Sequence, residues 1–233
     1  MDHVDGIGFD LDHTLAIDNR LERVAFLRLL ERVLEKGGRS IGTFSDEIDA
    51  IDALLSQQRH GECTIDAAVD KFVVSHGVAP DRSYTASFRA MAVDMVDEFV
   101  VALPGVDTTL TKLRDRGIKI AILTNGWSDL QQYKARRAGF SGAVIVSDDI
   151  GALKPAPAAF DTLLAQLDTQ AARTWYVGDS PETDIAGAQA AGLGTVWFNW
   201  ERKVYPEGVA QPQHTIESFG ALLSLLPDVV RAS

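Results

Sequence analysis

Two aspartates near the start of the chain, Asp10 and Asp12, directly follow a short apolar run. If this run is a buried strand, Asp10 lies at its end and Asp12 just past it, where the backbone turns. An acidic pair in such a place is more often a solvated turn than a catalytic site. Its meaning therefore depends on which other residues the fold brings to the same place.

Further polar residues follow later apolar runs of the chain. They are Thr124-Asn125-Gly126, Lys154-Pro155, and Gly178-Asp179 with Asp184 five residues on. In an open α/β sheet, ligands bind in the crevice beyond the carboxyl ends of the strands. We therefore expect these residues to gather with Asp10 and Asp12 at one edge of a sheet.

Carboxylates, a hydroxyl and a lysine gathered at one edge suit the transfer of a phosphoryl group. Mg²⁺ prefers oxygen ligands and keeps several waters, so one or two carboxylates and a backbone carbonyl can hold it. The predicted ligands are the carboxylates of Asp10 and Asp179 and the backbone carbonyl of Asp12. Such an ion neutralises the repulsion between an anionic nucleophile and an anionic phosphate.

The remaining roles follow from the same residue types. Attack by Asp10 on phosphorus would give an aspartyl-phosphate, which divides one difficult displacement into two easier ones. Asp12 could protonate the leaving alcohol and then deprotonate the attacking water. Lys154 adds a positive charge for the phosphate. The other predicted phosphate-binding groups are the hydroxyl of Thr124 and the backbone amides of Asn125 and Gly126, before a helix N-terminus.

The elements that must position these residues fall into two classes. Residues 17–103 carry apolar residues at helical spacing, with helices predicted over 19–37, from 43–45 onward, and over 64–76 and 83–101. Four amphipathic helices with no strand between them indicate a small helical bundle inserted after the first strand.

Strands and helices alternate in the rest of the chain. Strands are predicted at 118–123, 143–146, 174–177 and 195–198, and helices at 106–116, 128–138, 157–167, 183–191 and 216–226. Apolar strands that alternate with helices indicate a parallel sheet covered on both faces. The predicted fold class is α/β, with a Rossmann-like parallel sheet core of residues 1–16 and 104–233 and a helical cap domain of residues 17–103.

These motifs, in this order, resemble those of the haloacid dehalogenase-like hydrolase superfamily, whose members are mostly magnesium-dependent phosphatases. The resemblance rests on Asp10-Leu11-Asp12-His13-Thr14, Thr124, Lys154-Pro155, and Gly178-Asp179-Ser180 through Asp184. It implies that Asp10 is the nucleophile, Asp12 the acid and base, and Asp179, more often than Asp184, the metal ligand. The helical insert resembles the C1-type cap of that superfamily.

A narrower similarity concerns one branch of the superfamily. The resemblance is to the branch that contains nucleoside 5'-monophosphate phosphatases and acylneuraminate phosphatases. It rests on Leu123-Thr124-Asn125-Gly126, Ser147-Asp148-Asp149-Ile150-Gly151, Gly178-Asp179-Ser180 and Thr195-Val196-Trp197-Phe198-Asn199. The dehalogenase branch lacks an aspartate equivalent to Asp12, so the resemblance implies a small phosphomonoester as substrate. It leaves open which nucleotide, sugar phosphate or similar molecule is used.

The sequence leaves two other functions open. A phosphomutase would return the phosphoryl group to a sugar instead of water, and product analysis separates it from a phosphatase. A non-catalytic protein that binds a phosphate ligand is the second alternative. The complete set of motifs counts against it, because a degenerate site is expected to have lost at least one of these residues.

Composition limits the partners. The 233 residues include 33 acidic and 22 basic ones, and the net charge of -11 argues against a nucleic acid or an anionic membrane as the main partner. No apolar run reaches the roughly 20 residues that span a bilayer. The single cysteine, Cys63, and an acidic start without a secretion signal predict a cytoplasmic protein. The oligomeric state stays open.

Overall fold

The computed structural model describes residues 3–226 of the chain. The chain divides into two compact units, one of Met1–Ile17 with Val100–Ser233 and one of Asp18–Phe99. The sequence pattern predicts these boundaries at 17 and 103. Among the helices of the described residues, none combines the length and the apolar character that crossing a membrane requires.

The first unit is built on a six-stranded sheet with the strand order β5-β4-β1-β6-β7-β8. Its strands are β1 (Gly6–Phe9), β4 (Lys119–Thr124), β5 (Ala143–Val146), β6 (Thr174–Gly178), β7 (Gly194–Phe198) and β8 (His214–Ile216). All neighbouring strands run parallel. The predicted α/β fold with a Rossmann-like parallel sheet is therefore confirmed.

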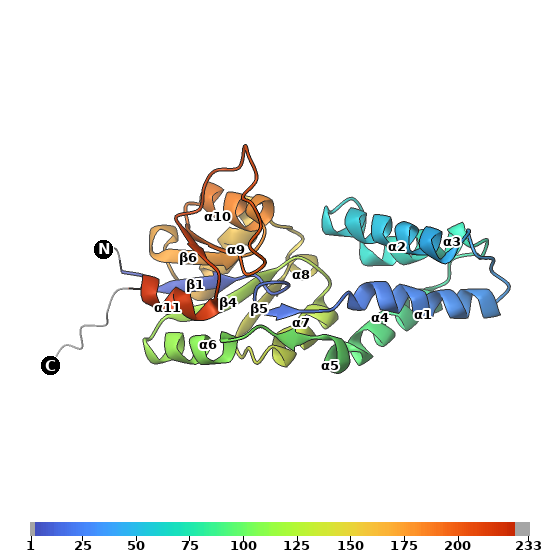
Figure 1. Cartoon of the computed structure of the whole chain (residues 1–233), viewed down its shortest axis with the longest axis horizontal. Helices are drawn as coiled ribbons and strands as arrows, with labels where there is room; N and C mark the ends of the chain where they lie inside the picture. The colour runs from blue at the N-terminus through green and yellow to red at the C-terminus, as the bar shows by residue number, and fades with distance from the viewer. Residues whose placement is uncertain (1–2, 227–233) are drawn as a thin grey trace. The chain divides into compact units, whose positions relative to one another are not determined.

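Helices cover both faces of this sheet, as the first unit in Figure 1 shows. On one face, α9 (Pro157–Leu167) packs so closely that a Cβ atom on Gly8 of β1 would lie 2.3 Å from Leu163 Cδ2. Any side chain at this position would force Leu163 to move, so glycine allows the close approach of β1 and α9. Helix α10 (Ala186–Ala190) lies on the same face, beside α9.

The opposite face of the sheet is covered by α6 (Val106–Asp115) and α11 (Leu222–Leu225). Successive side chains of a strand point to opposite faces, so Phe9 points away from α9. Its ring packs against Phe219, with ring centroids 5.7 Å apart. This unit also contains the helices α7 (Ser128–Arg137) and α8 (Ser147–Ile150), a 3₁₀ turn η1 (Ala171–Arg173), and the antiparallel pair β2 (Ala16–Ile17) and β3 (Val101–Ala102).

The second unit consists of helices. They are α1 (Leu21–Glu35), α2 (Phe44–Arg59), α3 (Ile65–Ser75), α4 (Arg82–Asp94) and α5 (Val96–Phe99). Local sequence sets their starts: Thr43 and Asp46 form a capping box at α2, and the side chains of Thr64 and Asp81 cap α3 and α4. Phe26 lies at the centre of the bundle, where its ring contacts those of Phe72 and Phe88.

The prediction of one continuous helix over 83–101 is wrong. Helix α4 ends at Asp94, the short α5 follows, and the chain then extends into β3. There, Val101 and Ala102 pair with Ile17 and Ala16. The amphipathic pattern does not reveal this pairing, because ladder hydrogen bonds to a segment far away in sequence replace the helical ones.

Two further helices differ from prediction. The segment predicted as a helix over 216–226 is not one helix. Its first residue, Ile216, is the last residue of β8, and the chain then passes through the 3₁₀ turn η3 (Phe219–Ala221) into α11. Ile216 pairs with Phe198 of β7, so this apolar residue belongs to the edge strand of the sheet and not to a helix. The predicted helix 183–191 begins earlier, as a π-helical turn η2 (Pro181–Ile185) that leads into α10.

Candidate active site

Asp10 lies directly after β1, at the carboxyl end of the sheet. Phe9, the last residue of β1, stands in register with Ile122 of β4 and Val177 of β6. The N–H of Asp10 donates to the carbonyl of Val177 at 2.9 Å, which fixes the backbone of Asp10 against β6. The residues that follow β4 and β6 therefore lie at the same edge as Asp10.

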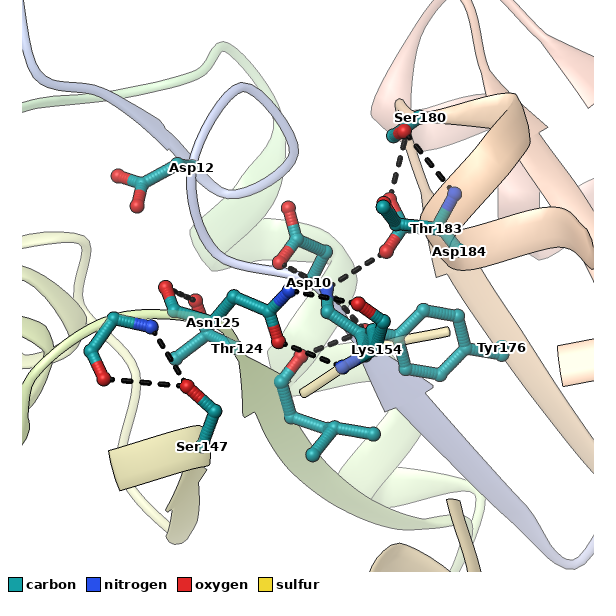
Figure 2. A network of polar contacts seen from close by, with 12 residues as sticks. Asp10, Asp12, Thr124, Asn125, Ser147, Lys154, Tyr176, Ser180, Thr183 and Asp184 are labelled. Carbon is teal, nitrogen blue, oxygen red and sulfur yellow. Dashed lines mark hydrogen bonds and ion pairs between the residues drawn. The ribbon is translucent and has the colours of Figure 1, made fainter. Parts of the chain in front are cut away.

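Lys154 is the centre of a buried network at this edge (Figure 2). Its Nζ donates to Asp10 Oδ1 at 2.6 Å, to Asp184 Oδ1 at 2.7 Å and to the Tyr176 hydroxyl at 3.0 Å. That hydroxyl in turn donates to the carbonyl of Leu123 at 2.6 Å. An ammonium group has three protons, so these three acceptors use them all and fix the position of the charge.

The backbone of Lys154 is held by the side chain of Asn125. The N–H of Lys154 donates to Asn125 Oδ1 at 2.8 Å, and Asn125 Nδ2 donates to the carbonyl of Lys154 at 3.0 Å. This pair joins the turn after β4 to the loop before α9. The sequence predicts only a backbone role for Asn125, in phosphate binding.

Asp184 reaches the network from η2. Its Oδ2 accepts a hydrogen bond from the N–H of Ser180 at 3.0 Å, while its Oδ1 accepts from Lys154. A Cβ atom on Gly178 would lie 2.2 Å from Asp184 Oδ2. Glycine at the end of β6 is therefore what allows Asp184 to lie beside Lys154.

The network contains more acidic groups than basic ones. Burial raises the pKa of Asp10 to about 7; the charge of Lys154 opposes this rise, and the charge of Asp184 adds to it. Burial and the charges of Asp184 and Asp10 raise the pKa of Asp179 to about 8. Although burial lowers the pKa of Lys154, the charges of Asp10 and Asp184 hold it well above its usual range. One ammonium thus faces three carboxylates.

This excess of acidic groups bears on whether a divalent cation fits the site. Asp10, Asp179 and Asp184 each offer a carboxylate oxygen, and these oxygens lie within 4.8 Å of one another. Carboxylate oxygens are the donors that Mg²⁺ prefers, so these residues fit such an ion. Both oxygens of Asp184 already accept hydrogen bonds, which favours Asp10 and Asp179 as direct ligands.

Asp12 is separate from this network. Its carboxylate accepts hydrogen bonds from two side chains of α7, Gln131 Nε2 at 2.9 Å and Lys134 Nζ at 3.0 Å. Figure 2 shows the carboxylate directed away from Asp10 and Lys154. The predicted role of its backbone carbonyl as a metal ligand stays a prediction.

The predicted phosphate-binding turn lies beside Asp10 (Figure 2), although two of its donors are already engaged. The hydroxyl of Thr124 donates to the carbonyl of Asn125 at 3.4 Å. Thr124 is buried at the end of β4. The N–H of Gly126 donates to Ser147 Oγ at 3.0 Å, so in this arrangement it is not available to a phosphate oxygen. Gly126 has a φ of 143° and a Cβ atom there would lie 2.6 Å from Gln131 Nε2, so glycine is needed for the close approach of Gln131.

A family model described as haloacid dehalogenase-like hydrolase matches residues 4–192. The chain belongs to the haloacid dehalogenase-like hydrolases. The resemblance inferred from the ordered motifs is thereby confirmed.

Two relatives in this family have named activities. The pyrimidine 5'-nucleotidase YjjG of Escherichia coli strain K12 is 37% identical over 153 residues, which cover 64% of this chain and 65% of that protein. The ribulose-1,5-bisphosphate 5-phosphatase of Halopiger xanaduensis is 36% identical over 134 residues, which cover 53% of this chain and 56% of that protein. The chain thus matches less than two thirds of the length of either relative.

A solved structure of the same family shares the fold. The HAD-hydrolase YfnB of Bacillus subtilis, solved with bound magnesium, superposes with a TM-score of 0.73 at 23% identity. The match covers 97% of this chain and 100% of that one.

Sequence reasoning missed three residues of the site in this haloacid dehalogenase-like hydrolase. Tyr176 lies inside an apolar strand and reads as a core residue, yet its hydroxyl contacts Lys154. Gln131 and Lys134 read as the solvated face of a helix, yet both are buried. Their spacing of three residues on the helix after the phosphate-binding turn is the one signal that could have found them.

Proposed function

We propose that the chain is a magnesium-dependent phosphatase that hydrolyses a small phosphomonoester through an aspartyl-phosphate on Asp10. The observation that carries this proposal is the contact of Lys154 with both Asp10 and Asp184, in a group that also contains Asp179. The phosphatase and nucleotidase names of the two relatives support the reaction class.

Each step can be assigned to residues of the chain. A carboxylate oxygen of Asp10 attacks phosphorus, a new O–P bond forms, and the ester O–P bond breaks. Asp12 donates a proton to the leaving oxygen, which departs as an alcohol. Asp12 then accepts a proton from water as that water attacks phosphorus, and inorganic phosphate leaves Asp10 as a free carboxylate.

The other residues hold charge and orientation. Lys154 neutralises part of the negative charge that gathers when a phosphate approaches Asp10. The Asn125 N–H and the Thr124 hydroxyl are the proposed donors to phosphate oxygens, the hydroxyl after it turns from the carbonyl of Asn125. The N–H of Gly126 is available only if it leaves Ser147. Asp10 and Asp179 would hold Mg²⁺, which supplies positive charge between nucleophile and phosphate when bound.

The proposed substrate is a nucleotide, a sugar phosphate or a similar small ester. The two relatives act on chemically different phosphates, according to their names, so likeness to them supports the reaction more than one substrate. A location in the cytoplasm, which the composition favours, stays a prediction.

Phosphate release from nucleotides, sugar phosphates and phosphoglycolate, with MgCl₂ or with EDTA, tests the proposal. We expect turnover of at least one ester with Mg²⁺ and its loss with EDTA. Asp10→Asn should abolish turnover, whereas Asp168→Asn, at an exposed acid paired with Lys119, should not. An isomerised sugar phosphate as the sole product would instead indicate a phosphomutase, and no turnover in the whole panel would contradict the proposal.

A further inference from the structure

We propose that Gln131 and Lys134 are positioning residues that hold the carboxylate of Asp12 for its exchange of a proton with the leaving group. This inference rests on the proposed function, because that function gives Asp12 its role as acid and base. The two side chains form what we call the α7 clamp, defined as Gln131 Nε2 and Lys134 Nζ.

The α7 clamp engages both oxygens of one carboxylate. Gln131 Nε2 lies 2.9 Å from Asp12 Oδ2, and Lys134 Nζ lies 3.0 Å from Asp12 Oδ1. A carboxylate with a separate donor on each oxygen cannot rotate about its Cβ–Cγ bond without breaking a hydrogen bond. The orientation of Asp12 is therefore set by α7 as well as by its own backbone.

The clamp is rigid because its two members are themselves fixed. Gln131 and Lys134 lie three residues apart, on one face of α7, and only 3% and 1% of them are exposed. Gln131 Nε2 also donates to the carbonyl of Asn125 at 2.8 Å. Its two amide protons thus join Asp12 to the phosphate-binding turn, and the two acceptors fix which end of the amide is nitrogen.

The burial of Lys134 indicates that its charge has a purpose. Removing an ammonium group from water is unfavourable, and an apolar side chain such as methionine would fill the same space without that cost. Lys134 is nevertheless almost fully buried, with a carboxylate of the site as an ion-pair partner. This choice of residue supports a role in the reaction over a role in packing alone.

Because of the clamp, Asp10 and Asp12 contact two different lysines. The three protons of Lys154 are used by Asp10, Asp184 and Tyr176, whereas Asp12 has Lys134. Asp10 is thereby kept for attack on phosphorus, and Asp12 is kept apart from the carboxylates that would hold a metal. Without Lys134, Asp12 Oδ1 no longer accepts a hydrogen bond from an ammonium group. The carboxylate can then rotate about its Cβ–Cγ bond.

A pair of matched esters tests the clamp. In 4-nitrophenyl phosphate the leaving oxygen needs no proton near neutral pH, whereas in 4-nitrobenzyl phosphate it does. The kcat/KM of each ester reports the steps up to formation of the aspartyl-phosphate. We expect Lys134→Met and Gln131→Met to reduce kcat/KM for the benzyl ester by on the order of 10²-fold, and for the phenyl ester by much less.

Three controls separate positioning from general damage. Gln132→Met changes the neighbouring residue, whose Nε2 donates to Val144 and not to Asp12, and should leave the ratio of the two esters unchanged. Lys134→Arg should recover part of the benzyl activity because it keeps the charge. Lys134→Met should add little to the defect of Asp12→Asn, since both act through one group. Equal losses on the two esters, or a faster benzyl reaction, would overturn the proposal.

A structural measurement tests the clamp without turnover. In crystals of the wild-type protein we expect Asp12 against Gln131 and Lys134, and in crystals of Lys134→Met or Gln131→Met a rotated or disordered Asp12. An unchanged Asp12 in these variants would overturn the clamp even if the enzyme is active. Wild-type protein that hydrolyses neither these two esters nor any ester of the panel would contradict the proposed function. If Asp12 is nevertheless rotated or disordered in the two variants, the hold of the α7 clamp on Asp12 stands.

Discussion

Lys154 Nζ lies 2.6 Å from Asp10 Oδ1, although 144 positions separate the two residues in the chain. The contact is buried, and Asp184 shares the same ammonium group at 2.7 Å. A single lysine therefore joins the end of β1, the loop before α9 and the π-helical turn after β6. The position of the proposed nucleophile depends on all three segments.

Removal of this lysine should destabilise the first unit. Lys154→Met leaves Asp10 and Asp184 buried without their cation, and breaking a buried ion pair costs about 3–5 kcal/mol. Urea unfolding in EDTA measures the change. Lys119→Met, which removes a half-exposed lysine paired with Asp168, should change the free energy of unfolding by at most about 1 kcal/mol. A Lys154→Met protein as stable as wild type would contradict this view of the network.

The Tyr176 hydroxyl should matter for the same network. Tyr176→Phe leaves Lys154 Nζ with one acceptor fewer and the Leu123 carbonyl without its donor, which should cost about 1–3 kcal/mol of unfolding free energy. Tyr133→Phe, at an exposed position of α7, is the matched control and should be neutral. Equal effects of the two substitutions in urea unfolding would show that the buried hydroxyl contributes nothing.

Gly178 should tolerate no side chain. In Gly178→Ala the new Cβ would lie 2.2 Å from Asp184 Oδ2, so Asp184 must move away from Lys154, at a cost of about 1–3 kcal/mol. Magnesium binding, measured by calorimetry, should weaken together with stability. Gly220→Ala is the control, because a Cβ atom there meets nothing within 4 Å. Wild-type stability and magnesium affinity in Gly178→Ala would refute the packing argument.

Acid should weaken the second unit through Glu47. Burial raises the pKa of Glu47, but three hydrogen bonds onto its carboxylate outweigh burial and lower the pKa from its ordinary 4.5. The donors are Ser40 Oγ at 2.6 Å, His76 Nε2 at 2.8 Å and the N–H of Ile41 at 3.0 Å. A lowered pKa means that the carboxylate contributes stability above pH 4.5, which is lost as pH falls through the folded-state pKa.

Glu47→Gln isolates this contribution. At pH 7 it should lower the free energy of unfolding by about 1.5–3 kcal/mol, and its difference from wild type should shrink below pH 4.5, where wild type loses the same charge. Asp70→Asn, at an exposed position of α3, should show neither effect. A difference between wild type and Glu47→Gln that stays constant with pH would contradict the assignment.

Much of this site is predictable from the sequence, because its residues follow strands. The apolar run that ends at Asp10 and the later runs before Thr124 and Asp179 indicate a parallel sheet. In such a sheet, ligands bind at the edge formed by the carboxyl ends of the strands, and this holds without knowledge of the side-chain contacts. Phosphoryl transfer then follows from residue types alone, and the family match over residues 4–192 agrees with it.

Other features depend on contacts that no periodicity reveals. The split of the helix over 83–101 arises from pairing with β2, far away in the sequence, and the strand β8 arises from pairing with β7. The direction of Asp12 depends on Lys134, a residue type that is solvated in most helices, and the N–H of Gly126 is taken by Ser147. Each of these is decided by a side chain or strand elsewhere in the chain.

The most direct measurement of the central claim is chemical trapping of the covalent intermediate. Enzyme quenched in acid during turnover of its best ester, then reduced with borohydride, should carry homoserine in place of one aspartate, located by peptide mass spectrometry. We expect this change at Asp10, its absence at Asp12, and its absence without substrate. Reduction at another residue, or none during active turnover, would contradict it.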